Sequence, residues 1–168
     1  IGWTRSLKAN LGKLTLGSFK PELVVQGMYR PFTKQHLYFD RFFNEYVNKM
    51  PAVFPYPNSG NMLICVCSTG SNKEFSAFIV NVPPDVEMIS KGQCFPLYTF
   101  DKVEEKGGQL FGSSTDSGYV KRDGITDEVL KEFKAHYDKK ITKLDIFYYF
   151  YGVLHSEEYR TRFASDLK

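Results

Sequence analysis

The stretch from Tyr29 to Arg41 places cationic and aromatic side chains close together around a proline. Its basic or potentially basic members are Arg30, Lys34, His36 and Arg41, and its aromatic members are Tyr29, Phe32, Tyr38 and Phe39. Long cationic side chains donate hydrogen bonds to phosphate oxygens, and Pro31 restricts the backbone beside Arg30. The stretch therefore suits a surface that holds phosphates in a fixed register. It also fits an ordinary edge strand with one face in water.

Several side chains in and beyond that stretch are of types that reach phosphates or base edges in DNA. The candidate contacts are Arg30, Lys34, Gln35, Arg41, Asn44, Ser71, Asn72, Lys73, Lys121 and Arg122. Arg pairs with guanine and Asn or Gln with adenine in the major groove, whereas Lys mainly supplies salt-sensitive phosphate contacts. Taken singly, each candidate also fits a solvated surface position. We expect the aromatic residues of the stretch to pack in the core rather than against bases.

The positive charge of the chain is concentrated in its first third. The 168 residues carry a formal net charge of +3, but residues 1–50 alone carry +5, and residues 51–100 and 101–168 carry −1 each. A basic segment is weakly typical of proteins that bind a polyanion. On charge alone, the simpler interpretation is a solvated basic face.

No motif in the chain supplies the groups that catalysis requires. The phosphate-binding pattern G-x-x-x-x-G-K-[ST] does not occur, and no Ser or Cys has an evident His and acid partner. Asp85 and residues 104–106 imitate the P-D…E-x-K pattern of metal-dependent nucleases, but residues 104–106 fit a charged turn rather than a strand. Asn81–Asp85 is interpreted as a turn that ends a strand. We therefore expect no catalytic residue, metal or cofactor in this chain, and binding as its function.

The cysteines and the composition favour one globular domain in a reducing compartment. The cysteines, Cys65, Cys67 and Cys94, are odd in number, and the first two lie in an apolar run, so we expect buried free thiols. No apolar run approaches the roughly 20 residues of a membrane span, so we expect no membrane contact and a cytoplasmic location. A chain of 168 residues is most simply one domain. Because it begins at Ile1 rather than Met, we expect it to be part of a longer protein.

The elements that must position the candidate residues are expected to be strands and loops over about residues 20–100. Apolar and β-branched runs predict strands at 23–29, 37–39, 62–67 and 75–80, an edge strand at 94–100 interrupted by Pro96, and a further pairing segment at 86–89. A helical face is predicted from Leu7 to Leu14 and a short helix over 42–50. Prolines predict a loop over 51–60, and residues 101–124 read as a long flexible connection.

The last third of the chain, residues 125–168, is expected to be helical. Thr126 and Thr142 each precede an apolar periodic run and suit the N-cap position, and Asp145 stands at the third helical position after Thr142. Ser156 suits the N-cap of a further short helix. The final two helices could form a helix-turn-helix, but acidic residues stand where a recognition helix would meet bases, so we expect them to pack in the core. The predicted fold is α+β: a twisted, mostly antiparallel sheet from residues 23–100, packed against the C-terminal helices.

Five segments, taken in order, carry a resemblance to a known family. They are Ile1–Lys8, Tyr29–Arg41, Cys94–Tyr98, Asp145–Ser156 and Glu158–Lys168, and together they span nearly the whole chain. In these segments the chain resembles the C-terminal target-recognition region of the type ISP restriction-modification enzymes, large single-chain proteins often named as helicases.

The resemblance implies a parent enzyme with a nuclease, an ATP-driven DNA translocase and an adenine-N6 methyltransferase, which together need Mg²⁺, ATP and S-adenosylmethionine. Those catalytic parts lie upstream in such proteins. For this chain it implies recognition of duplex DNA beside the methyltransferase domain of the same parent chain. We expect Arg30, Lys34 and Arg41 to position the DNA and the loops around Asn72 and Arg122 to choose bases. The other function left open is a protein-docking module without direct DNA contact.

Overall fold

The computed structural model describes residues 3–68, 70–103 and 118–167. Its helices are α1 (Arg5–Gly12), α2 (Met50–Val53), α3 (Asp127–His136), α4 (Lys143–His155) and α5 (Glu157–Arg162), and a 3-10 turn, η1, covers Pro21–Leu23. Its strands are β1 (Val24–Arg30), β2 (Thr33–Tyr38), β3 (Leu63–Val66), β4 (Ala77–Val80), β5 (Gln93–Pro96), β6 (Tyr98–Lys102) and β7 (Tyr119–Asp123). All pairings between these strands are antiparallel, and the predicted α+β class is confirmed.

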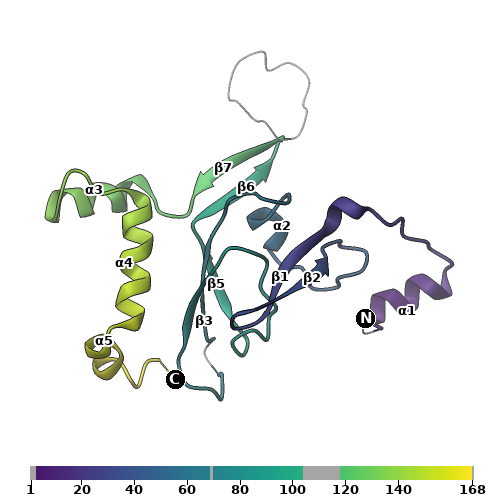
Figure 1. Cartoon of the computed structure of the whole chain (residues 1–168), viewed down its shortest axis with the longest axis horizontal. Helices are drawn as coiled ribbons and strands as arrows, with labels where there is room; N and C mark the ends of the chain where they lie inside the picture. Colours follow the sequence, from purple (N-terminus) through teal and green to yellow (C-terminus); the bar gives the residue numbers. More distant parts are fainter. Residues whose placement is uncertain (1–2, 69, 104–117, 168) are drawn as a thin grey trace, which may run out of the picture.

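The middle of the molecule is a three-stranded sheet in the order β4–β3–β5 (Figure 1). The apolar run predicted as a strand forms β3, where Leu63 and Cys65 are fully buried. β5 is an edge strand, as predicted, and such a position tolerates the missing N–H group of Pro96. The break falls one residue later than expected, at Leu97, whose N–H donates to the carbonyl of Met62.

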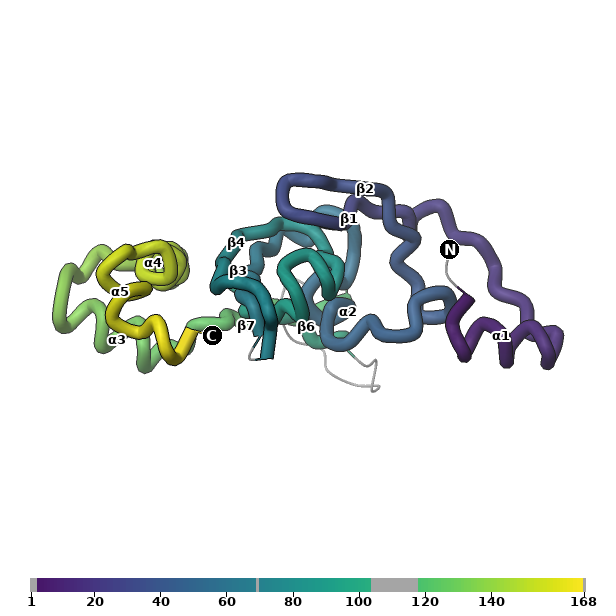
Figure 2. The backbone as a smooth tube through the Cα atoms, turned by 90° about the horizontal axis from the view of Figure 1, so that it is seen from below, coloured from purple at the N-terminus to yellow at the C-terminus, as the bar shows by residue number. Residues whose placement is uncertain are grey.

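The two faces of β3 serve two different hydrophobic cores, because side chains alternate along a strand. On one face, Leu63 and Cys65 pack with Met28, Val53, Phe54, Val80, Met88 and Ile89. On the other face, Ile64 packs with Leu97 and with Phe147 of α4. Helix α4 therefore covers one side of the central sheet, which confirms the predicted packing of the sheet against the C-terminal helices. Figures 1 and 2 show α3–α5 at one end of the molecule and α1 at the other.

The prediction of one sheet over residues 23–100 is wrong in its extent. The described strands form three small sheets: β1–β2, β4–β3–β5 and β6–β7. Two prolines explain the first separation. Among the described residues, Met28 alone joins β1 to the segment after β4 by backbone hydrogen bonds, with the Pro83 carbonyl and the Asp85 N–H, because Pro83 and Pro84 have no N–H group to continue a ladder. The second separation follows from the turn at Leu97, which redirects the chain into β6.

Three local predictions are also corrected. Residues 42–49 form turns instead of the predicted helix, and α2 begins only at Met50. The Asp40 carboxylate accepts a hydrogen bond from the N–H of Phe42, which favours a turn at that point. Pro51 does not exclude helix, because it stands in the first turn of α2, where its missing N–H group needs no partner. Residues 86–89 form a turn instead of a strand.

The predicted connection over residues 101–124 is partly strand. Its first two residues belong to β6 and residues 119–123 form β7, while residues 104–117 lie outside the described part of the chain. β7 ends at Asp123, and the N–H of the next residue, Gly124, donates to the Leu97 carbonyl. A Cβ atom at Gly124 would lie 2.2 Å from the Pro96 carbonyl oxygen, so only glycine lets the β6–β7 ribbon approach the end of β5 this closely.

The helix starts of the last third are confirmed. Thr126 and Ser156 each accept a hydrogen bond from the backbone three residues on, and Thr142 forms a complete capping box with Asp145. Lys143 then joins α4 to the preceding segment through ion pairs with Asp123 and Asp127, both at 2.6 Å. Within the described ranges, no helix is both long and apolar enough to cross a membrane.

Candidate nucleic-acid interface

The Tyr29–Arg41 stretch forms most of a two-stranded ribbon, β1–β2, which lies along one edge of the molecule (Figure 2). Four of the six residues of β2 are exposed, so the ribbon has one wet face. Its other face is anchored by the buried Met28 side chain and by Gly27. A Cβ at Gly27 would lie 3.3 Å from both Leu37 Cβ and the Pro83 carbonyl oxygen, so the absence of a side chain lets the ribbon sit close to its support.

The aromatic residues of the ribbon are divided between packing and exposure. Tyr38 stacks on Phe19 at 5.3 Å and its hydroxyl donates to the Ser18 carbonyl, while Phe39 packs against the core. The expectation that the aromatics are core residues is wrong for Tyr29 and Phe32, since Tyr29 is 42% exposed and Phe32 is 89% exposed. Sequence periodicity could not distinguish the exposed pair, Tyr29 and Phe32, from the packed pair, Tyr38 and Phe39. The reason is that the ribbon buries only those side chains that face residues 81–85.

The cationic side chains in and beside the ribbon differ in whether they have a partner within the domain. Arg30 lies over the Tyr29 ring at 4.1 Å and forms a 3.4 Å ion pair with Asp85. Lys34 donates to the side-chain oxygen of Asn81 at 3.3 Å, a neutral partner that leaves its charge uncompensated. Arg41 is exposed and makes no hydrogen bond or ion pair with another described residue. Lys34 and Arg41 are therefore the most available cations for an external anion.

A groove of about 610 Å³ brings Lys34 and Arg41 together. It runs between the ribbon, the loop of residues 54–60 and the segment after β4, and Tyr119 at the start of β7 also lines it. Glu22 and Asp40 line the same groove, so its electrostatic potential is mixed rather than uniformly positive. The groove extends from the β1–β2 ribbon to the β6–β7 ribbon. These two ribbons are far apart in the sequence, so the sequence did not predict that they share a groove.

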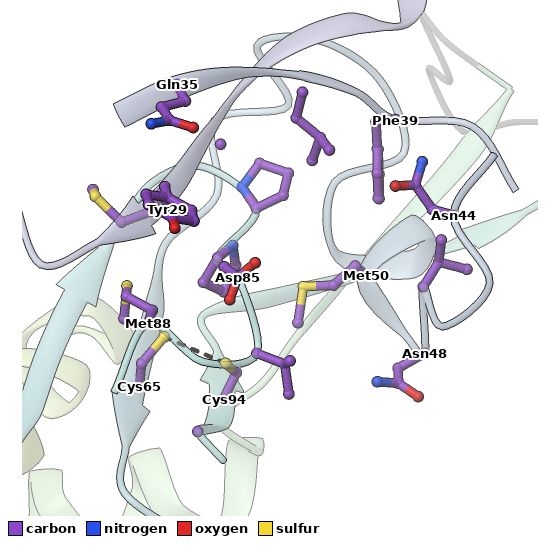
Figure 3. Close-up of a pocket in the computed structure, with 18 of the residues that line it drawn as sticks. Tyr29, Gln35, Phe39, Asn44, Asn48, Met50, Cys65, Asp85, Met88 and Cys94 are labelled. Carbon is purple, nitrogen blue, oxygen red and sulfur yellow. Dashed lines mark hydrogen bonds between the residues drawn. The ribbon is translucent and has the colours of Figure 1, made fainter. Parts of the chain in front are cut away.

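A second cavity of about 300 Å³ lies beneath the ribbon (Figure 3). Gln35, Asn44 and Asp85 are among its polar lining residues and come from three separate segments, and its apolar lining includes Met28, Met50 and Met88. The Asn44 amide nitrogen donates to the carbonyls of Tyr38 and Asp40 at 2.7 and 2.8 Å, which gives that amide a structural task. Its DNA contact stays a prediction, as does that of Gln35.

The remaining candidates lie in two places that the fold keeps apart. Ser71, Asn72 and Lys73 follow β3, and the Ser71 hydroxyl accepts from the Lys73 N–H at 3.0 Å. Lys121 and Arg122 lie on β7, opposite Phe100 and Thr99 of β6. Since β6 begins beside the other end of β3, the two groups stand at opposite ends of the central sheet (Figure 1).

Lys121 and Arg122 both have partners within the β6–β7 ribbon. The ammonium group of Lys121 lies 3.3 Å from the centre of the Tyr98 ring, and Arg122 forms an ion pair with Asp101. The sequence did not indicate that four residues contact the candidate cations, namely Tyr98, Asp101, Asn81 and Asp85. Each lies 20 or more residues from its partner, so no local pattern could have identified it.

The cysteines give one unexpected geometry on the wall of the second cavity. Cys65 and Cys94 face each other across β3 and β5, and their sulfur atoms lie 3.3 Å apart (Figure 3). The hydrogen bond with Cys94, assisted by burial, raises the pKa of the Cys65 thiol, and the same bond lowers the pKa of Cys94. All the cysteines are free, as expected, but only Cys65 is fully buried.

Mild oxidation is expected to join Cys65 to Cys94 and to leave Cys67 reduced. Facing strand positions lie within the Cα separation that a disulfide requires, and Cys67 is instead hydrogen bonded to Ser76 and to the Ile89 carbonyl. Diamide would accept the two electrons and two protons that the thiols release. Mass spectrometry after alkylation should then find one alkylated cysteine instead of three, and none in Cys67→Ser. Three alkylated thiols after oxidation would contradict the prediction.

The described residues contain no cluster of three or more side chains that could hold a metal ion. Asp85, the first member of the nuclease-like pattern, is paired with Arg30, and its carboxylate also accepts from the N–H of Glu87. Residues 104–106, the rest of that pattern, lie outside the described part of the chain. The geometry offers a binding surface made of cations, amides and exposed rings.

Comparison with solved structures finds that the chain is similar to parts of longer proteins solved in complex with DNA or a DNA mimic. The chain is similar to part of the protein in "cryoEM structure DrdV-DNA complex", with a TM-score of 0.81, 30% identity, and coverage of 98% of this chain and 15% of that one. It is also similar to part of the "ATP-dependent Type ISP restriction-modification enzyme LlaBIII bound to DNA", with a TM-score of 0.77, 33% identity, and coverage of 99% and 10%.

A third solved relative is a nuclease-deletion mutant of the Type ISP restriction-modification enzyme LlaGI in complex with a DNA substrate mimic. Its TM-score is 0.73 at 33% identity, over 99% of this chain and 13% of that one. The chain thus spans 10–15% of the length of these relatives. A search of curated proteins finds no match. Because the family model "Type ISP C-terminal specificity domain" matches residues 1–168, the resemblance is confirmed and the chain belongs to this family.

Proposed function

We propose that this chain recognises a short, asymmetric sequence in duplex DNA and presents the target adenine to a methyltransferase domain of the same parent protein. The observation that carries the proposal is the match of the whole chain to a specificity domain whose solved relatives hold DNA or a DNA mimic. The exposed ribbon with Arg30 and Lys34 supports it from the residues upward.

The proposed contacts fall into phosphate contacts and base contacts. Lys34 and Arg41 share one groove and have no acidic partner among the described residues, so they suit phosphates, with Arg30 beside them. The loop around Asn72 and the β7 segment around Arg122 would choose bases. Since those two regions lie at opposite ends of the central sheet, a duplex that contacts both must extend along the sheet.

The remaining activities belong to the rest of the parent protein. The parent is proposed to contain an adenine-N6 methyltransferase, an ATP-driven translocase and a nuclease, and to use S-adenosylmethionine, ATP and Mg²⁺ in those parts. This chain itself would supply binding and no catalytic group. A cytoplasmic location is proposed with it, because the DNA that a restriction-modification enzyme protects is there.

A docking module without direct DNA contact is the second candidate function. One observation favours it: the segment around α1 exposes apolar side chains, with Leu11 58%, Leu14 82% and Leu16 91% exposed. Exposed apolar side chains grouped in one segment are typical of protein–protein contacts. The same segment could equally contact the parent's own domains while the ribbon contacts DNA, so this observation does not oppose the first proposal.

Exchange of residues 1–168 in the parent enzyme tests the proposal directly. Replacing them with the corresponding region of a related enzyme that methylates a different sequence is expected to change the methylated sequence to that of the donor. Methylation mapping of host DNA by sequencing measures the outcome, and the reciprocal exchange is the matched control. A hybrid enzyme that methylates the original sequence would reject the recognition role and favour the docking module.

A further inference from the structure

We infer that Phe32 is a wedge that inserts between two neighbouring base pairs when the β1–β2 ribbon contacts duplex DNA. The inference rests on the proposed function and adds to it a residue that deforms the bound DNA. Its basis is the exposure of Phe32, the geometry of the turn that carries it and the charges beside it. Proteins that deform DNA often place an apolar side chain in a base step, which unstacks the step and bends the duplex.

The exposure of Phe32 is unusual for its ribbon. The turn between β1 and β2 has Pro31 and Phe32 at its centre, so the phenyl ring stands at the tip of the ribbon. The side chain is 89% exposed, whereas Leu37 and Tyr38 at the other end of β2 are half-buried. The ring contacts Phe78 edge-on, with 5.5 Å between centroids, which orients it while leaving nearly all its surface in water.

The backbone at this tip also disfavours a phenylalanine. Phe32 has a φ of +62°, the left-handed conformation that glycine or asparagine normally supplies at this place in a turn. Local conformational preference and burial therefore both oppose an aromatic residue here. An external partner that contacts the ring accounts for a side chain whose one aromatic contact within the described residues, edge-on to Phe78, buries little of its surface.

The support of the tip is rigid enough to push a ring into a base stack. Pro31 restricts its own φ, and Met28 is buried and bonded in both directions, its N–H to the Pro83 carbonyl at 2.9 Å and its carbonyl to the Asp85 N–H at 2.8 Å. The ribbon therefore cannot slide away from residues 83–85 without breaking two backbone hydrogen bonds. A wedge on a freely moving loop would yield instead of unstacking the bases.

Cations stand on both sides of the ring. Arg30 precedes Phe32 by two residues on β1, and Lys34 follows it by two residues on β2. Each strand of the ribbon therefore carries one cation next to the tip, Lys34 with only a neutral partner and Arg30 in an exposed ion pair with Asp85. Contacts from these side chains to phosphates on either side of a base step would hold the ring over that step. The combination of a central apolar side chain with flanking cations favours DNA over an apolar protein surface as the partner of the tip.

The test uses the full-length parent enzyme and a duplex that contains the site found by methylation mapping. 2-Aminopurine, whose fluorescence rises when it is unstacked, replaces in turn each purine except the target adenine, which a methyltransferase itself takes out of the stack. The wild-type enzyme is expected to raise the fluorescence several-fold at one step. Phe32→Gly should abolish that rise and weaken binding about tenfold, since one stacking contact is lost. Phe32→Trp, which keeps an aromatic ring, should retain both the fluorescence rise and the affinity.

Two features make the test specific to the wedge. Glycine suits a φ of +62°, so Phe32→Gly keeps the turn and should not lower the thermal midpoint of unfolding. Tyr46→Ala removes another aromatic side chain, 83% exposed but away from the tip, and should leave the fluorescence rise unchanged. Tight binding of wild-type enzyme without unstacking at any position would overturn the wedge alone. Failure of the wild-type enzyme to bind the duplex would overturn the proposed function, and the wedge with it.

Discussion

Replacement of Asn61 with alanine is expected to lower the free energy of unfolding by about 3–5 kcal/mol. Asn61 is 2% exposed and its amide makes four hydrogen bonds to the backbone. Its nitrogen donates to the carbonyls of Val53 and Tyr98, and its oxygen accepts from the N–H groups of Met62 and Tyr98. Alanine would leave these backbone groups unpaired in the interior, where each lost bond leaves a desolvated polar group.

Asn61→Ala should also disturb the proposed DNA-binding surface. Asn61 joins α2 to the start of β6, so its loss frees the β6–β7 ribbon that carries Lys121 and Arg122. Urea unfolding followed by circular dichroism measures the change, with Asn72→Ala as the control at an exposed asparagine. A change below about 1 kcal/mol in Asn61→Ala would mean that water replaces the amide and that the site is open to solvent.

The combined variant Arg30→Ala/Lys34→Ala/Arg41→Ala in the parent enzyme is expected to bind duplex DNA about a hundredfold more weakly at roughly 0.1 M salt. Three lost phosphate contacts should also reduce the slope of log Kd against log salt by about 2 to 3. Lys34 and Arg41 should account for most of the loss. Arg30 must first leave its ion pair with Asp85, which offsets part of any contact that it makes.

A charge-matched control separates a local contact from an effect of net charge. Lys131→Ala/Lys139→Ala/Lys140→Ala removes the same number of positive charges from exposed positions on and after α3, far from the ribbon (Figure 1). Its affinity and salt dependence should stay near those of the wild type. Equal losses in both combined variants would indicate non-specific attraction, and no loss in either would remove the ribbon from the DNA interface.

The sequence predicted best those elements whose signals are local. Thr126, Thr142 and Ser156 start helices as expected, because an N-cap needs only a side chain and the next three residues. The strand β3 was also predicted correctly, since a short apolar run bounded by glycines is too short for a buried helix and fits a buried strand. The failures at residues 42–50 and 86–89 have one cause, namely apolar residues that pack from turns instead of from regular elements.

The α+β class, the family and the types of side chain available for binding could all be inferred from the amino-acid sequence. Those properties depend on local propensity and on the order of motifs along the chain. The three-dimensional packing of the chain was needed to show which candidate residues are free, which are paired and which lie together. Arg30 with Asp85, Lys34 with Asn81, and the tip at Phe32 are set by how separate segments meet. Such contacts depend on the packing of the whole chain, because each partner lies dozens of residues away and no periodic pattern encodes the distance between them.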